Sequence, residues 1–201
     1  MRFPVNSTNV CEAVAESMER TVDLEWHEEQ YTKNQQKIAK RIMICAGTGC
    51  IASGALKVYK ALQEECLKND VPVVIELKEE PVTDSVLLSK SGCQGFCQMG
   101  PLVTITPDDI LYTKVKPEDV AEIVSKTLMN GEVIDGLLYK DAEGKSCKGQ
   151  SDVPFYNQQT RTILKGCGGV DPSSIQEYIA QNGYYAARKV ISTKSDEEIC
   201  K

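Results

Sequence analysis

Two cysteine-bearing stretches stand out in this sequence: CAGTGCIASG at residues 45–54 and SGCQGFCQMGP at residues 91–101. Each stretch holds a pair of cysteines among glycines. Four residues separate the cysteines of the first pair, three separate those of the second, and 42 residues lie between the pairs. The candidate ligands of a metal site are therefore Cys45, Cys50, Cys93 and Cys97.

An extended segment precedes each cysteine pair. Residues 41–45 (RIMIC) predict a short buried strand, and residues 85–93 (SVLLSKSGC) lead as an extended segment into the second pair. Two loops side by side at one end of a sheet would place four sulfurs around a common centre. Glycine lets backbone amides approach those sulfurs and adopt positive φ. The loop glycines are at positions 47, 49, 54, 92, 95 and 100.

The spacing alone leaves three kinds of site open. Thiolate-only sites suit both iron–sulfur clusters and zinc. Structural zinc sites usually use C-x2-C pairs and redox dithiols use C-x-x-C, and neither cysteine pair has that spacing. The bacterial and plant-type ferredoxin runs do not match either. The pattern favours an iron–sulfur site over zinc, with inert or disulfide-bonded cysteines as the third alternative.

The sequence around the two loops predicts a small layered α/β domain. Strands and helices mix without the strict alternation of a doubly wound sheet. The first expected helix has Ser53 as a candidate N-cap, and one side of it carries Leu56, Tyr59, Leu62 and Cys66. Helices are expected at 53–68 and 117–131, and strands at 71–77, 102–106 and 110–115.

Composition narrows the classes of function. The net charge is −6 and no basic stripe occurs, which argues against a nucleic-acid partner. No apolar run reaches the length of a membrane span, and the N-terminus lacks the apolar core of a signal peptide. We therefore expect a cytoplasmic protein without membrane contact. Nine cysteines, an odd number, argue against a secreted disulfide scaffold and for metal or redox chemistry.

Three segments flank the predicted α/β domain. Residues 1–40 are polar with apolar residues at helical spacing, and predict a helical N-terminal extension that packs on the domain or docks on a partner. Residues 140–153 are rich in Gly, Ser and Lys and predict a linker. Residues 154–201 predict a short helical C-terminal segment, in which Asp171 is a candidate N-cap.

The residues around the cysteines resemble those of a known family. CAGTGCIASG together with SGCQGFCQMGPLVTITPDDILYTKVKPEDVAEIV is similar to the thioredoxin-like [2Fe–2S] ferredoxins. The family includes the domain fused to the start of NADH-binding flavoprotein subunits of NAD-linked hydrogenases and formate dehydrogenases. The resemblance covers residues 41–139. It implies a thioredoxin-like domain with a mixed sheet, and a [2Fe–2S] cluster whose cofactor-binding and metal-binding residues are Cys45, Cys50, Cys93 and Cys97.

The C-terminal segment resembles a second protein. PFYNQQTRTILKGCGGVDPSSIQEYIAQNGYYAARKVI, at residues 154–191, is similar to the opening of the complex I-type flavoprotein subunit that binds FMN and NADH. In that subunit the flavin loop, the nucleotide site and a [4Fe–4S] motif come later. We therefore expect residues 154–201 to be the truncated beginning of an NADH/FMN-binding domain. FMN, NAD(H) and further Fe–S clusters are expected only in the full-length parent.

These resemblances imply an electron-transfer module with no catalytic residue of its own. The cluster would relay single electrons within a multisubunit NAD-linked oxidoreductase: a hydrogenase, a formate dehydrogenase or a complex I-like enzyme. The partners would be the iron–sulfur and catalytic subunits of that complex. Phe96, Met99 and Pro101 would shield the cluster and form the partner surface. Two alternatives stay open, a structural zinc docking module with four cysteine ligands and a free-standing [2Fe–2S] ferredoxin.

Apart from Cys11, the other cysteines and the single histidine are expected to have no direct role in the cluster. Cys66 is predicted in the core, Cys147 exposed in the linker, and Cys167 in a structural position. Cys11 either packs in the N-terminal helix or serves as an extra ligand. His27 is expected at the surface because no partner motif accompanies it.

Overall fold

A computed structural model describes residues 23–75, 77, 80–193 and 198 of the chain. The N-terminal extension is described only from residue 23, as helix α2 (Leu24–Gln35), which Asp23 caps by accepting from the amide of Trp26. The predictions for Cys11 and for the apolar positions of residues 1–22 lie outside the described residues. No helix in the described part of the chain is long and apolar enough to cross a bilayer.

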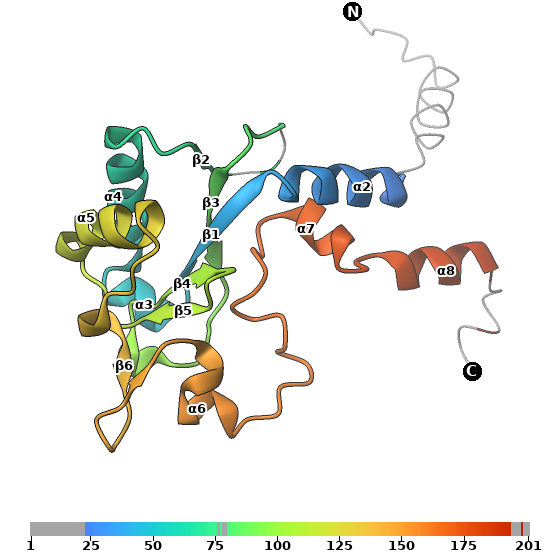
Figure 1. Cartoon of the computed structure of the whole chain (residues 1–201). Helices are drawn as coiled ribbons and strands as arrows, with labels where there is room; N and C mark the ends of the chain where they lie inside the picture. Colours follow the sequence, from blue (N-terminus) through green and yellow to red (C-terminus); the bar gives the residue numbers. More distant parts are fainter. Residues whose placement is uncertain (1–22, 76, 78–79, 194–197, 199–201) are drawn as a thin grey trace, which may run out of the picture.

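A five-stranded mixed sheet forms the centre of the fold (Figure 1). Its central strand β1 (Ile38–Cys45) pairs in parallel with β3 (Ser85–Ser91) and antiparallel with β4 (Val103–Thr106). The outer strands are β2 (Val73–Val74), parallel to β3, and β5 (Ile110–Tyr112), antiparallel to β4. This mixed sheet confirms the predicted α/β class, although β2 is much shorter than the expected strand at 71–77.

Helix α4 (Ala55–Lys68) covers one side of the sheet. Its buried residues recur with helical spacing and line one face, which packs on the sheet core. Two details of the prediction were wrong. Gly54, with φ at +99°, precedes the helix in place of Ser53, and Leu56 is 47% exposed. The buried face consists of Ala55, Val58, Leu62 and Cys66.

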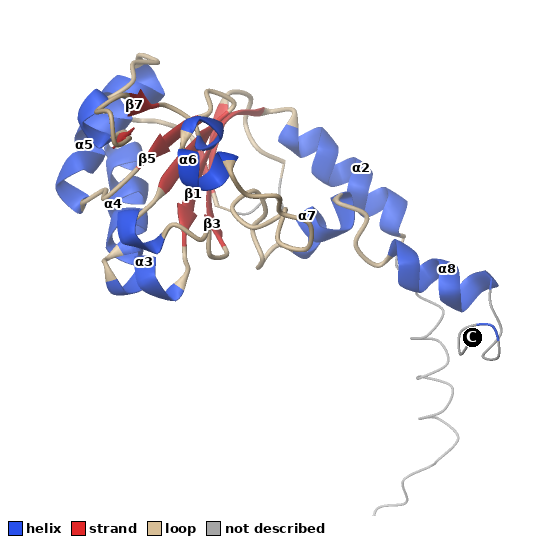
Figure 2. Ribbon diagram, turned by 90° about the horizontal axis from the view of Figure 1, so that it is seen from below, coloured by secondary structure: helices blue, strands red, loops and turns tan. Residues whose placement is uncertain are grey.

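The predicted hairpin and last helix of the domain are confirmed in outline. Strands β4 and β5 enclose a turn at residues 107–109. The helical run begins with a 3-10 turn at Pro117–Asp119 and continues through α5 (Val120–Glu122) into a π-helix over Ile123–Met129. Gly131, with φ at +73°, follows this run. Figures 1 and 2 show α5 on the same side of the sheet as α4, and the core lies between these helices and the strands.

Residues 140–153, expected to be a linker, contain ordered structure. Strand β6 (Tyr139–Lys140) pairs with β7 (Ser146–Cys147), and a 3-10 turn follows at Gln150–Asp152. The prediction that Cys147 is exposed was wrong, because its side chain is 3% exposed and belongs to the core. Val153 is fully buried in the same core. The segment therefore packs on the α/β domain.

The C-terminal segment returns along the molecule to α2. After α6 (Pro154–Asn157) the chain runs to α7 (Ile175–Ala180), which packs against α2, and then forms α8 (Tyr185–Thr193) (Figures 1 and 2). The N-cap of α7 is Ser174, whose hydroxyl accepts from the amide of Glu177, and the prediction of Asp171 as the cap was wrong. Asp171 instead accepts from Ser173.

Candidate functional site

The sheet register brings the two cysteine loops together. Cys45 is the last residue of β1, and its partner in the parallel strand β3 is Ser91. The carboxyl ends of neighbouring parallel strands lie at the same edge of a sheet, so both loops leave the sheet at adjacent points. The thiol of Cys45 reaches into the second loop and donates to the carbonyl of Gly92 at 3.8 Å. The expectation that the loops lie side by side is confirmed.

The first loop buries its two thiols. Immediately after β1 the chain forms the short helix α3 (Thr48–Ala52), which carries Cys50. Cys45 is 1% exposed and Cys50 is fully buried, and both belong to the apolar core. The first cysteine pair is therefore held by the sheet and by the helical turn that follows it.

The second loop leaves its thiols exposed but is anchored by a buried glutamine. Cys93 and Cys97 are exposed, and Cys97 opens a 3-10 turn over Cys97–Met99. Between them the side chain of Gln94 is fully buried and donates to the hydroxyl of Ser91 at 3.2 Å. Its amide oxygen accepts from Gln150 at 3.3 Å. A buried amide with partners on both sides fixes the loop between the two cysteines.

Three glycines form the contact between the loops, and each faces a cysteine of the opposite loop. A Cβ atom at Gly47 would lie 2.9 Å from the Cβ of Cys93, and one at Gly49 would lie 3.2 Å from the Cβ of Cys97. A Cβ at Gly100 would lie 2.5 Å from the Sγ of Cys50. A side chain at Gly47 or Gly100 would therefore force a neighbouring residue of the opposite loop to shift, and one at Gly49 would require a smaller adjustment.

The four thiols approach one another in pairs. The Sγ atoms of Cys93 and Cys97 are 3.8 Å apart, and the thiol of Cys45 lies close enough to Cys50 to raise the pKa of its thiol. Two thiolates on one tetrahedral metal ion, with bonds of about 2.3 Å, lie about 3.8 Å apart. Within the described ranges, no three His, Cys, Asp or Glu side chains come close enough to share one ion. The Cys93–Cys97 distance matches two thiolates on one metal ion, a spacing that suits a zinc ion and an iron–sulfur cluster alike.

Burial and neighbouring thiols raise the pKa values of Cys50 and Cys97. Burial is the main cause that raises the pKa of Cys50 to about 12, and the neighbouring Cys45 thiol is the second cause. The thiol of Cys93 raises the pKa of Cys97. A bound cation reverses both effects because a coordinated thiol is deprotonated. Loading of the site with metal therefore releases protons.

Residues from the C-terminal segment cover the second loop. Phe96 stacks on Phe155 with ring centroids 4.7 Å apart, and its ring meets the edges of Tyr139 and Tyr156 at 5.3 and 5.6 Å. Arg161 donates to the carbonyl of Gln94 at 2.9 Å. Phe96 and Met99 are half-buried and Pro101 is buried, as shielding residues would be. The expected partner role of these three remains a prediction.

Sequence reasoning did not identify Gln94, Tyr156 or Arg161 as parts of this site. Their contacts join positions more than 50 residues apart in the chain, so no local pattern indicates them. The only local signal is the pair of adjacent aromatic residues at 155–156. Of the other cysteines that the structure describes, Cys66 and Cys147 are buried in the core, and Cys167 is half-buried and lines a pocket together with Cys93. His27 is half-buried and packs edge-on against Trp26.

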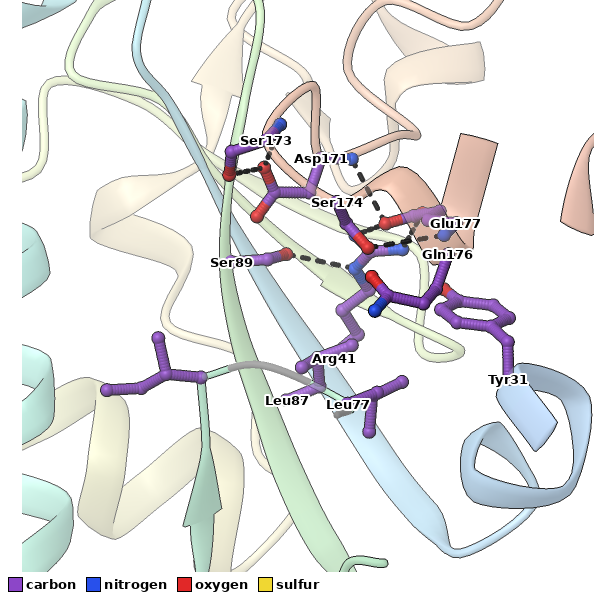
Figure 3. Close-up of a pocket in the computed structure, with 11 residues that line it drawn as sticks. Tyr31, Arg41, Leu77, Leu87, Ser89, Asp171, Ser173, Ser174, Gln176 and Glu177 are labelled. Atoms are coloured by element: carbon purple, nitrogen blue, oxygen red, sulfur yellow. Dashed lines mark hydrogen bonds and ion pairs between the residues drawn. The ribbon is translucent and has the colours of Figure 1, made fainter. Parts of the chain in front are cut away.

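A separate pocket lies where the C-terminal segment meets the sheet (Figure 3). Arg41 of β1 donates to both carboxylate oxygens of Glu177 in α7, at 2.6 and 2.9 Å, and its Nε donates to Ser89 of β3 at 3.0 Å. The two charged side chains are only 12% and 4% exposed. Burial is the main cause that raises the pKa of Tyr31, beside this pair, to about 12. The ion pair fastens α7 to the sheet.

Comparison with known proteins gives matches over the domain that carries the cysteines. The family model described as thioredoxin-like [2Fe–2S] ferredoxin matches residues 9–128. A 2Fe–2S ferredoxin of Aquifex aeolicus is 34% identical over 89 residues, which are 44% of this chain and 71% of that protein. A 2Fe–2S ferredoxin of Clostridium pasteurianum is 36% identical over 74 residues, 35% of this chain and 72% of that protein.

A solved structure also aligns with this domain. The crystal structure of the wild-type thioredoxin-like [2Fe–2S] ferredoxin from Aquifex aeolicus aligns with 51% of this chain and 97% of that chain, at 28% identity and a TM-score of 0.40. The family match ends at residue 128, before the segment that carries Phe155, Tyr156 and Arg161.

Proposed function

Because this chain belongs to the thioredoxin-like [2Fe–2S] ferredoxin family, we propose that Cys45, Cys50, Cys93 and Cys97 hold its [2Fe–2S] cluster. The family and the relatives establish a thioredoxin-like α/β domain that acts as a [2Fe–2S] electron-transfer module. The donor set fits the cluster, since four cysteine thiolates are its usual ligands. The pairing of Cys93 with Cys97 at 3.8 Å is the observation that carries the assignment.

The protein contributes position and environment, while the cluster supplies reversible one-electron chemistry when bound. Cys45 and Cys50 hold one side of the site inside the core, and Cys93 and Cys97 leave the other side near the surface. Electrons would enter and leave a bound cluster through the exposed side, where a partner's own cofactor could approach most closely. The seven described cysteines are free thiols, which suits a reducing compartment such as the cytoplasm.

We further propose that the module works inside a multisubunit NAD-linked oxidoreductase, joined to the opening of a complex I-type flavoprotein subunit. The packing of the C-terminal segment on the second cysteine loop supports this. Phe155 stacks on Phe96, and Arg161 binds the carbonyl of Gln94. The segment that resembles a flavoprotein thus lies against the exposed thiols. FMN, NAD(H) and further Fe–S clusters would belong to the longer parent, and its iron–sulfur and catalytic subunits would be the partners.

Reconstitution with iron and sulfide under anaerobic conditions tests the electron-transfer assignment. We expect a coloured protein whose cluster is reduced and reoxidised by one electron, with an EPR signal that integrates to about one spin per chain. Cys97→Ala should abolish the signal, and Cys167→Ala, outside the four thiols, should keep it. A colourless product, or a wild-type chain without a reduced-state signal, would contradict the proposal.

Flavin and metal analysis separates the proposal from its alternatives. We expect residues 1–201 alone to bind no FMN and to oxidise no NADH, and stoichiometric flavin in the purified chain would overturn this. About one zinc per chain without acid-labile sulfide would identify a zinc docking module instead. A free-standing ferredoxin would transfer electrons to added redox proteins equally well after residues 154–201 are deleted, whereas the proposal predicts loss of transfer within the parent complex.

A further inference from the structure

Tyr156 of α6 carries a buried hydroxyl group without a partner. Its oxygen is inaccessible to solvent and makes no hydrogen bond within the described part of the chain. In contrast, the fully buried Tyr112 satisfies its hydroxyl with Thr127 at 2.7 Å and with the amide of Ile134 at 3.1 Å. Buried polar atoms are rarely left unpaired, so an orphan hydroxyl indicates a partner that protein atoms do not supply.

Tyr156 packs against the core that holds the first cysteine pair and against Phe96 of the second cysteine loop. The tyrosine packs on the core cluster that contains Cys45 and Cys50, and its ring meets the edge of Phe96, beside Cys97, at 5.6 Å. Burial raises the pKa of Tyr156, and the thiols of Cys45, Cys50 and Cys93 act in the same direction, against the effect of Arg161. The core packing and the ring contact with Phe96 therefore place Tyr156, with its unpaired hydroxyl, beside both cysteine loops.

Arg161 fixes the orientation of the tyrosine. Its guanidinium lies over the Tyr156 ring, 4.9 Å from the centroid, and the same group donates to the carbonyl of Gln94 at 2.9 Å. A cation over an aromatic face is an attractive contact, so the ring is tied to the loop that carries Cys93 and Cys97. Tyr156 cannot rotate toward solvent without losing both the ring contacts and this cation.

We propose that the Tyr156 hydroxyl donates a hydrogen bond to a sulfur of the [2Fe–2S] cluster and raises its reduction potential; this rests on the proposed function. Hydrogen bonds to cluster sulfurs stabilise the more negative, reduced state. The donor comes from beyond residue 128, where the family match ends. The C-terminal segment therefore tunes the cluster as well as covering it. Tyr156 is a positioning and tuning residue, because the iron ligands are cysteines.

The test compares reduction potentials of the reconstituted full chain and two tyrosine variants. Tyr156→Phe removes only the hydroxyl and keeps the ring contacts. At a fixed solution potential we expect the ratio of oxidised to reduced cluster to rise about tenfold, which is a potential lower by about 59 mV for a one-electron couple. The control Tyr178→Phe changes a half-exposed tyrosine of α7 and should leave the potential unchanged.

Pulsed EPR of the reduced cluster provides a second readout that a merely structural role would not change. The wild-type chain should show an exchangeable proton coupled to the cluster that disappears in D2O, and Tyr156→Phe should lack that coupling. An unchanged potential together with an unchanged coupling would overturn the inference while the cluster assignment stands. A wild-type chain that assembles no [2Fe–2S] cluster would instead overturn the proposed function, and this inference with it.

Discussion

Replacing Gly47 with alanine probes the contact between the two cysteine loops. Gly47 precedes α3 with φ at −65° and ψ at 153°, a conformation open to any residue, so alanine adds no backbone strain. The new Cβ would lie 2.9 Å from the Cβ, 3.0 Å from the Cα and 3.0 Å from the Sγ of Cys93. Because a Cα atom cannot rotate away, the whole second loop must move relative to the first.

The size of the effect follows from the overlap. Overpacking of a close-packed site typically costs about 1–3 kcal/mol. A difference of about 1.4 kcal/mol is a tenfold change in an equilibrium constant. If the whole cost falls on the arrangement that binds the cluster, the equilibrium constant for cluster binding should fall by about 5-fold to about 140-fold. Gly49→Ala, whose Cβ would lie 3.2 Å from the Cβ and 3.4 Å from the Sγ of Cys97, should lie at the low end of this range.

The second cysteine loop offers a matched control. A Cβ at Gly92, next to Cys93, would meet nothing within 4 Å, so Gly92→Ala should behave like the wild type. The assay is the loss of iron to a chelator from the reconstituted variants, followed by the visible absorption of the cluster. The expected order of retention is Gly92→Ala first, then Gly49→Ala, then Gly47→Ala. Equal retention in Gly47→Ala and Gly92→Ala would refute the reasoning that the loops touch at these glycines.

Three further predictions concern packing and protonation away from the thiols of the site. Glu177→Ala removes the carboxylate that pairs with the buried guanidinium of Arg41, so the docking of α7 should weaken by about 3–5 kcal/mol. Hydrogen exchange of the α7 amides measures this loss, and protection equal to that of the wild type would contradict the prediction. Tyr112→Phe removes the hydrogen bond to Thr127 and should lower the free energy of unfolding by about 1–2 kcal/mol in urea titrations; no change, or a gain, would show that this bond is not stabilising. Burial raises the pKa of Cys66 from 9.0 to about 11, so its contribution to stability is complete below about pH 9 and is lost as the pH rises toward 11. Cys66→Ala should flatten the alkaline decline in the stability of the metal-free chain over that range, and an identical decline in both proteins would rule this cause out.

The sequence predicts the framework of the site because its signals are local. An apolar run before each cysteine pair indicates the two strands, and the register of β1 with β3 then places Cys45 opposite Ser91. The short spacing within each pair keeps both thiols of a loop near one strand end. The residues around the cysteines indicate the family, which the family match confirms.

Details of the prediction differ from the structure where a second local interaction decides the conformation. Ser53 has a capping side chain, but the preceding residues already form α3, so the chain needs the positive φ of Gly54 to start α4. Leu56 is exposed, whereas Val58 packs in the core together with Leu62 and Cys66. Polar composition likewise suggested a linker at 140–153, whereas Asp141 accepts from the amides of Glu143 and Lys145 and closes a hairpin.

The parts of the site that come from the C-terminal segment could not be predicted from the sequence. Tyr156 and Arg161 act through contacts with Phe96 and Gln94, which depend on how the chain returns after β7. The sequence indicates only that two aromatic side chains follow one another at residues 155–156. Which ring they meet, and whether a hydroxyl is left unpaired, is decided by tertiary packing.

The most direct test of the account is the content of iron and acid-labile sulfide in single-cysteine variants of the reconstituted chain. The wild type should contain about two iron and about two sulfide per chain. Alanine in place of Cys45, Cys50, Cys93 or Cys97 should each abolish the stable cluster, while Cys167→Ala should leave the content unchanged. One zinc without sulfide in the wild type, or full cluster content after loss of one of the four thiols, would contradict the account.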